Sequence, residues 1–168
     1  DGSALTTLQE ARSLALVPSW ARKALSDQMF GERAGSPFQF FEAHLEEKRR
    51  STDSKGRTRT YWVTVFQGQI WQFQAPKEFY GTTRVARDMG WFNALGALGS
   101  KFDRARLESP DFEKLFEVFT TDQVEARYLL TPDVMQAILD LEKAFHGARI
   151  RLAFSNGYIY AAAEGGNL

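Results

Sequence analysis

The segment from Arg149 to Glu164 constrains the fold most, because it reads as two short strands joined by a turn centred on Asn156-Gly157. Asn-Gly is the strongest short-range signal for a two-residue hairpin, since a type I′ turn needs positive φ at both positions. This turn also sets the register, and cross-strand partners share a face. The expected pairs are Phe154 with Ile159, Leu152 with Ala161 and Ile150 with Ala163 on the core face, and Arg149 with Glu164 on the outer face.

Two Pro-Asp dipeptides that follow a hydroxyl residue predict helix starts at Ser109-Pro110-Asp111 and Thr131-Pro132-Asp133. The hydroxyl caps the helix, proline suits its first position, and the acid favours the positive end of its dipole. Between them we predict a helix over 122–130, where Thr120 and Gln123 also have capping spacing, although its apolar residues alternate as in a strand. The helix that begins at Pro132 has an apolar stripe formed by Val134, Ile138, Leu141 and Phe145. Its C-terminal end is marked by Lys143, His146 and Gly147.

The N-terminal half predicts two helices and then strands. Thr7 and Glu10 have capping-box spacing before a helix that Pro18 ends, and Ser19 caps a second helix that stops at Gly31. From Phe38 the pattern alternates as in a half-buried strand. A further hairpin is predicted about Gly68-Gln69, and 81–100 reads as a loop with one helical turn. In the strand that begins at Phe38, we expect one face to be buried and the other exposed: Phe41, Ala43 and Leu45 inside, and Glu42, His44 and Glu46 outside. In the hairpin about Gly68-Gln69, we expect one face to carry Trp62, Thr64, Phe66, Trp71 and Phe73.

This order of elements predicts the α+β class: a single domain over 1–168 with a mainly antiparallel β-sheet and helices packed on one face. It divides into an N-terminal helical segment, residues 1–30, and a core, residues 38–168. A chain of 168 residues with 43% hydrophobic content is long enough to bury such a core without disulfides.

Composition and motifs exclude several kinds of site. The chain has no cysteine and only two histidines, His44 and His146, which read as a strand's outer face and a helix end. Neither GxGxxG, GxxxxGK[ST] nor GxSxG occurs. We therefore expect no catalytic residue, no metal site and no cofactor. Basic and acidic residues both number 21, so no overall field attracts nucleic acid, and no nucleic-acid partner is expected.

Two groups of charged residues remain as candidate binding sites. Asp122, Glu125 and Arg127 lie close together in an apolar stretch, as a buried ion-pair network, a capped helix or a recognition site requires. Residues 46–60 hold six basic and three acidic side chains, a local charge of +3, and read as a polar strand tip. The tip either contacts an anionic membrane or protects a strand end from aggregation. Its basic residues are Lys48, Arg49, Arg50, Lys55, Arg57 and Arg59.

Two segments carry a family resemblance: LESPDFEKLFEVFTTDQVEARYLLTP from Leu107 to Pro132, and VFQGQIWQFQAPKEFYGTTRV from Val65 to Val85. They resemble a bacterial family known as domain of unknown function 3137. The resemblance implies a domain that many members carry after two predicted membrane helices, facing the cytoplasm. It implies no activity and no catalytic residue. This chain begins with Asp1 and has no apolar run near the ~20 residues of a membrane helix, so any tether is expected in a segment absent from it.

The leading functional hypothesis is a non-catalytic interaction domain, the soluble cytoplasmic part of a membrane-tethered bacterial protein, whose partner is a protein or an anionic membrane surface. The alternative is a small-ligand-binding domain or an enzyme whose carboxylates meet in a pocket that only the fold creates.

Overall fold

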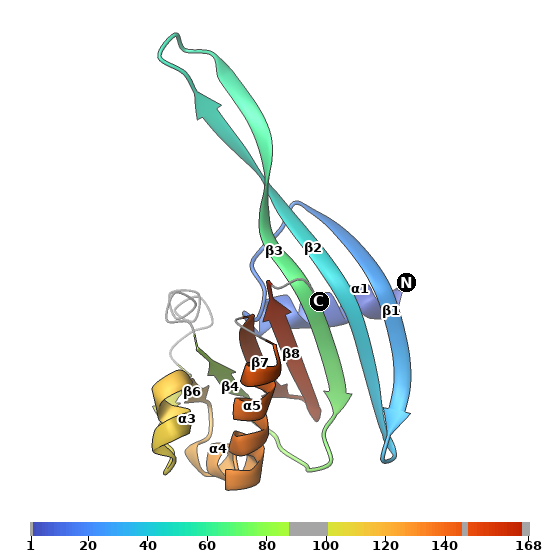
Figure 1. The fold of residues 1–168 in the computed structure, drawn as a ribbon, viewed down its shortest axis with the longest axis vertical. Coiled ribbons are helices and arrows are strands. Elements are labelled where there is room, and N and C mark those ends of the chain that lie inside the picture. Colours follow the sequence, from blue (N-terminus) through green and yellow to red (C-terminus); the bar gives the residue numbers. More distant parts are fainter. Residues whose placement is uncertain (1, 88–100, 146–147, 166–168) are drawn as a thin grey trace.

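A computed structural model describes residues 2–87, 101–145 and 148–165. Within these residues eight strands form one sheet in the order β1-β2-β3-β8-β7-β4-β6-β5, and every neighbouring pair is antiparallel (Figure 1). The strands are β1 Arg22–Arg33, β2 Ser36–Thr52, β3 Thr58–Gln74, β4 Thr83–Ala86, β5 Asp103–Ala105, β6 Glu117–Thr120, β7 Arg149–Ser155 and β8 Tyr158–Glu164. The helices are α1 Gly2–Ser13, α3 Pro110–Leu115, α4 Gln123–Leu129 and α5 Pro132–Ala144. The predicted α+β class with an antiparallel sheet is confirmed.

The sheet has a hydrophobic core on each face. Helices α3, α4 and α5 cover one face, where Phe112 and Ile138 pack with Ile150 of β7. Helix α1 covers the other face, where Leu8 packs with Phe41 and other strand residues, so helices lie on both faces of the sheet and not on one face as expected. Successive strand residues point to opposite faces, so a strand between two helical layers is apolar at nearly every position. The outer face predicted for the closing hairpin is therefore also buried, as the burial of nearly all of β7 shows.

The strongest local signals are confirmed. The closing hairpin has the predicted register at all four pairs, and its turn has φ of 52° at Asn156 and 79° at Gly157. Pro110 and Pro132 begin α3 and α5, and α4 occupies the stretch predicted as a helix. Its N-cap is Asp122 and not Thr120.

The predicted second N-terminal helix is wrong, because residues 22–33 form the edge strand β1 along β2. Only Leu25 in this strand is even half-buried, so the segment lacks the apolar face that a packed helix needs. Backbone pairing with β2 supplies the hydrogen bonds instead. The first helix exists, but it already includes Gly2, and Thr7 lies buried within it, donating to Gln72 Oε1 at 3.1 Å. The helical segment predicted for residues 1–30 is thus correct only for its first half.

The hairpin predicted about Gly68 is also wrong, since β3 runs unbroken through this residue. Phe66 consequently faces α1, while Trp71 lies against the core of the opposite face. Glycine is needed here for a close approach, because a Cβ at Gly68 would lie 2.0 Å from the Ala163 carbonyl oxygen. The loop predicted over 81–100 begins with a strand, β4, and its helical turn lies outside the described residues, as do His146 and Gly147.

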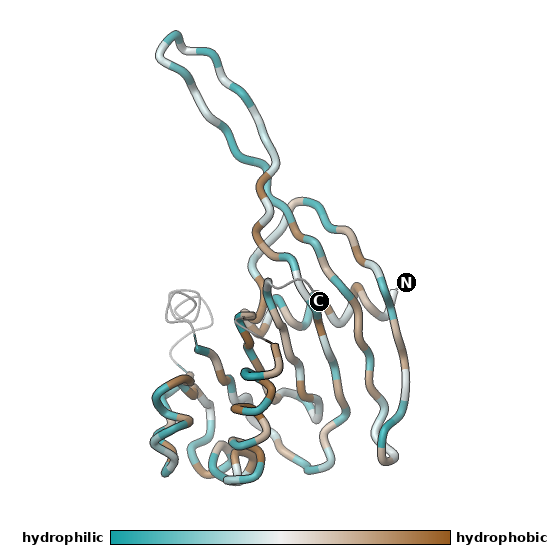
Figure 2. Tube along the Cα trace, viewed as in Figure 1, coloured by the Kyte–Doolittle hydropathy of each residue, from teal (hydrophilic) through white to brown (hydrophobic). Residues whose placement is uncertain are grey.

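Strands β2 and β3 continue beyond the rest of the sheet. The pairing of β1 with β2 ends where Arg22 lies opposite Glu46. The pairing of β8 with β3 ends where Glu164 lies opposite Gly68. Residues 47–63 therefore form a two-stranded ribbon that projects from the sheet, which we call the arm (Figure 1). Hydrophilic residues occupy most of its length (Figure 2).

Candidate functional site

Pairing between the two strands of the arm divides its side chains between two faces, because directly opposed residues point the same way. Lys48 lies opposite Trp62 and Arg50 opposite Thr60, so these four share one face. The hydroxyls of Thr52 and Thr58, 3.3 Å apart, extend the same face toward the tip. We call this the Trp62 face, and it contains no carboxylate between residues 47 and 63.

The opposite face of the arm is basic as well. Arg49 lies opposite Tyr61, and Arg59 lies opposite Ser51. The acid on this face is Glu47, whose Oε2 lies 3.8 Å from Arg49 Nη2, a long and solvent-exposed ion pair. Such pairs contribute little free energy, so Arg49 remains available to a partner.

The arm concentrates positive charge in a neutral chain. It contains six basic and two acidic side chains, a net charge of +4, whereas the whole chain has none. Among the described residues, no carboxylate lies within ion-pair distance of Lys48, Arg50, Lys55 or Arg59. The arm therefore presents uncompensated charge on both faces.

The acid at the base of the arm is neutralised by an ion pair. Glu46 forms a hydrogen-bonded ion pair with Arg22 of β1, whose guanidinium also lies over the Trp62 ring, 4.0 Å from its centroid. The hydrogen bond from Arg22 lowers the pKa of Glu46 and raises that of Arg22. Trp62 is 40% exposed, so part of its ring remains open to a partner.

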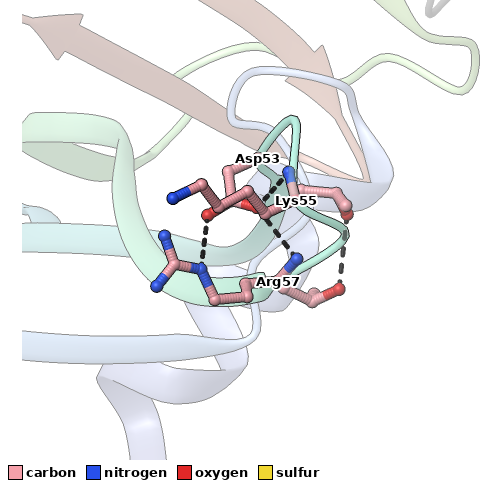
Figure 3. A network of polar contacts seen from close by, with 5 residues as sticks. Asp53, Lys55 and Arg57 are labelled. Carbon is pink, nitrogen blue, oxygen red and sulfur yellow. Dashed lines mark hydrogen bonds and ion pairs between the residues drawn. The ribbon is translucent and has the colours of Figure 1, made fainter.

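The tip is ordered by one carboxylate (Figure 3). Asp53 Oδ1 accepts hydrogen bonds from the backbone N–H groups of Lys55 and Arg57, each at 2.9 Å, and Oδ2 accepts one from Arg57 Nε at 2.9 Å. The backbone hydrogen bond from Arg57, followed by its side chain, lowers the pKa of Asp53. Arg57 therefore shapes the turn, while the Lys55 ammonium group forms no ion pair with any carboxylate in the part of the chain that the structure describes.

The other predicted group, Asp122, Glu125 and Arg127, forms local structure. Asp122 Oδ1 accepts from the N–H groups of Val124 and Glu125 at 3.0 Å each and so caps α4. Arg127 is exposed and donates to the Gln123 carbonyl, and no ion pair joins it to a carboxylate among the described residues, so it is not part of a buried ion-pair network.

Glu125 joins α4 to the loop before β4. Its two carboxylate oxygens accept from the backbone N–H groups of Tyr80 and Gly81, both at 2.8 Å. A Cβ at Gly81 would lie 2.6 Å from Thr121 Oγ1 and 3.0 Å from Glu125 Oε1, so a larger residue would push against the side chains that surround this loop. The two segments that carried the family resemblance thus bind each other through Glu125.

Comparison with known proteins identifies a family. The family described as Protein of unknown function (DUF3137) matches residues 64–167. The chain belongs to this family. The DUF3137 match begins at Thr64, directly after the arm, and therefore leaves α1, β1, β2 and the arm outside it. No curated protein and no solved structure matches the chain.

Sequence reasoning missed two buried arginines in the DUF3137 region. Arg84 and Arg151 are 2% and 1% exposed, and their guanidinium groups donate to the carbonyls of Ala15 and Leu16, both at 3.0 Å. These carbonyls follow the end of α1, where a cation is favourable. Arg151 also pairs with Glu164 at 2.6 Å. Burial, with a contribution from the Arg151 charge, lowers the pKa of Arg84 to about 10, so Arg84 stays charged at neutral pH.

Among the described residues, no helix is both long and apolar enough to cross a bilayer. No group of three or more His, Asp or Glu side chains gathers in this part of the chain to hold a metal ion.

Proposed function

We propose that this chain is a non-catalytic interaction domain whose arm binds the surface of an anionic lipid bilayer. The observation that carries the proposal is the net charge of +4 on a ribbon that projects clear of the sheet. Each Lys or Arg near an anionic leaflet contributes about 1 kcal/mol. In a bacterial, membrane-tethered parent, the cytoplasmic leaflet would supply this surface.

The Trp62 face favours a bilayer over other polyanions. It combines two unpaired cations with an exposed indole and three threonines, and it has no acid to repel lipid headgroups. Tryptophan is enriched at membrane interfaces because its ring is apolar at one end and polar at the other. A ribbon lying flat would place Lys48, Arg50 and Trp62 against the headgroups together.

The alternative of a carboxylate pocket receives less support. Asp122 and Glu125 use their oxygens on backbone N–H groups. The cavities that the described residues form between α5 and the sheet have no Asp or Glu in their lining.

Sedimentation with vesicles tests the proposal. Phosphatidylcholine vesicles with and without phosphatidylglycerol are compared for the wild type and for the quadruple variant K48E/R49E/R50E/R59E, which leaves the Asp53–Arg57 turn intact. Lys48 and Arg50 lie on the face that contacts the headgroups, so at about 1 kcal/mol per residue their reversal should weaken binding to the anionic vesicles by about 30-fold. Reversal of Arg49 and Arg59 on the opposite face should weaken it further. Binding should also fall as salt is added.

The matched control is K101E/R106E/K114E/K143E, which reverses four exposed cations outside the arm. It has the same net charge as the arm variant and should keep most of the binding. Equal loss in both variants would show that only overall charge matters, and this would overturn the proposal. Binding of duplex DNA through the arm without binding to anionic vesicles would overturn it too.

A further inference from the structure

Among the described residues, no helix covers half of one face of the sheet. Helix α5 lies in front of β7, whereas β2 and β3 carry no helix on that side (Figure 1). The uncovered strands instead carry packed aromatic rings. The ring centroids of Phe40 and Trp71 are 4.4 Å apart, and the Trp71 ring stacks on that of Phe73 with 5.8 Å between the centroids. Phe38 lies 6.2 Å from Phe73 and extends the cluster toward the β1–β2 turn.

Three adjoining cavities run along this aromatic cluster, and we call them together the α5 groove. The first, about 370 Å³, lies between α5 and β8, and the second, about 240 Å³, lies between α5 and β3. The third, about 480 Å³, reaches the β1–β2 turn. Each cavity shares lining residues with the other two: Leu141 and Leu152, Trp71 and Phe73, and Pro76 and Ile159. Their sizes are of the order of the cavities that hold small ligands.

The charges around the α5 groove point to the chemistry of its occupant. Among the described residues that line the three cavities there is no Asp or Glu, and the two with charged side chains are Arg33 and Lys77. Lys77 Nζ is already engaged, 3.2 Å from the Tyr128 carbonyl oxygen and 4.6 Å from the centroid of the Tyr128 ring. Arg33 is exposed, and no carboxylate among the described residues pairs with it.

Arg33 stands at the polar end of the α5 groove. Ser36 and Gln74 line the same cavity as Arg33 and contribute a hydroxyl and an amide to its lining. The remaining lining toward α5 is apolar, apart from the engaged Lys77. A ligand that matches both ends has one anionic head and an unbranched apolar tail.

We infer that the α5 groove binds a free long-chain fatty acid. Its carboxylate lies at Arg33, where a planar guanidinium offers two parallel hydrogen bonds. Its tail passes Trp71, Phe73 and Ile159 and ends between Leu141 and Leu152. This site is separate from the arm and does not depend on the arm's function.

Calorimetric titration with palmitate and with hexadecanol tests head and tail separately. Arg33→Glu should weaken palmitate binding by at least about 10-fold, since a charge-assisted hydrogen bond is lost and a repulsion is added, while hexadecanol binding changes little. Ile159→Trp narrows the groove and should weaken both ligands. Arg106→Glu is the control for Arg33→Glu, at an exposed position away from the groove. Val63→Trp is the control for Ile159→Trp, at a part-exposed position away from the groove, and both controls should bind the ligands as the wild type does.

Three results would overturn the inference. One is a wild type that shows no saturable palmitate binding. Another is an Arg33→Glu protein, folded by circular dichroism, that binds palmitate with unchanged affinity. The third is a wild-type dimer that palmitate does not dissociate, since a second copy would then fill the groove. The arm variant K48E/R49E/R50E/R59E should still bind palmitate, so failure of the bilayer proposal is distinguishable from failure of this one.

Discussion

Replacing Gly68 with alanine tests whether this glycine permits a close approach between strands. Gly68 lies opposite Glu164 at the last pair of the β3–β8 ladder. An added Cβ would lie 2.0 Å from the Ala163 carbonyl oxygen and 2.9 Å from the carbonyl carbon, both backbone atoms that cannot rotate away. An ordinary contact begins near 3.4 Å, so the strands must separate locally by 1.4 Å, which is 3.4 minus 2.0.

This displacement sets the expected loss of stability. The flanking hydrogen bond from Gly165 N to the Gln67 carbonyl is 2.9 Å long, and a stretch of more than 1 Å breaks it. Loss of about two ladder hydrogen bonds, together with poorer placement of Glu164 against Arg151, costs about 3–4 kcal/mol. Alanine regains about 0.5–1 kcal/mol because glycine weakens a strand interior. We expect a net loss of about 2–3.5 kcal/mol and a Tm about 4–14 °C lower.

Urea unfolding followed by circular dichroism measures the change. Gly68→Asn should be at least as destabilising as Gly68→Ala, because the obstacle is steric. Gly157→Asn should retain most of the stability, since Gly157 has φ of 79°, no atom lies within 4 Å of its added Cβ, and asparagine tolerates this conformation. A Gly68→Ala protein within about 0.5 kcal/mol of the wild type would refute the close-approach argument, because such a difference is typical of a neutral surface change.

Two further predictions concern the carboxylates that order loops. Glu125→Ala should cost about 1–3 kcal/mol in urea unfolding, more than Arg127→Ala, because it leaves the N–H groups of Tyr80 and Gly81 without their acceptor; equal losses would contradict the clamp. Asp53 has a lowered pKa, so its ordering of the tip should be fully present above its ordinary pKa and be lost as pH falls through the lower folded value. In an NMR titration, the Lys55 and Arg57 amide signals should shift with this carboxyl group, and Asp53→Asn should abolish the transition; an unchanged transition would assign it to another group.

Local sequence signals predicted elements wherever one or two residues impose a backbone conformation. Asn156 and Gly157 specify their turn through positive φ, and Pro110 and Pro132 mark helix starts whatever the rest of the chain does. The same kind of signal failed at Gly68, because glycine suits both a turn and a close contact, and only the opposing strand distinguishes them. It failed for β1 because capping residues occur by chance, while strand pairing depends on distant residues.

The candidate sites divide in the same way. The basic run at 46–60 was visible in the sequence, but its projection depends on where β1 and β8 stop, and its two faces depend on the β2–β3 register. The close-set charges at 122–127 read as a possible site, yet tertiary contacts make them a cap and a clamp. Arg84 and the α5 groove carried no sequence signal at all. Composition and short-range conformation were thus determined by the sequence alone, whereas burial, cavities and exposed charge were decided by which distant segments meet, because those properties belong to surfaces and not to single residues.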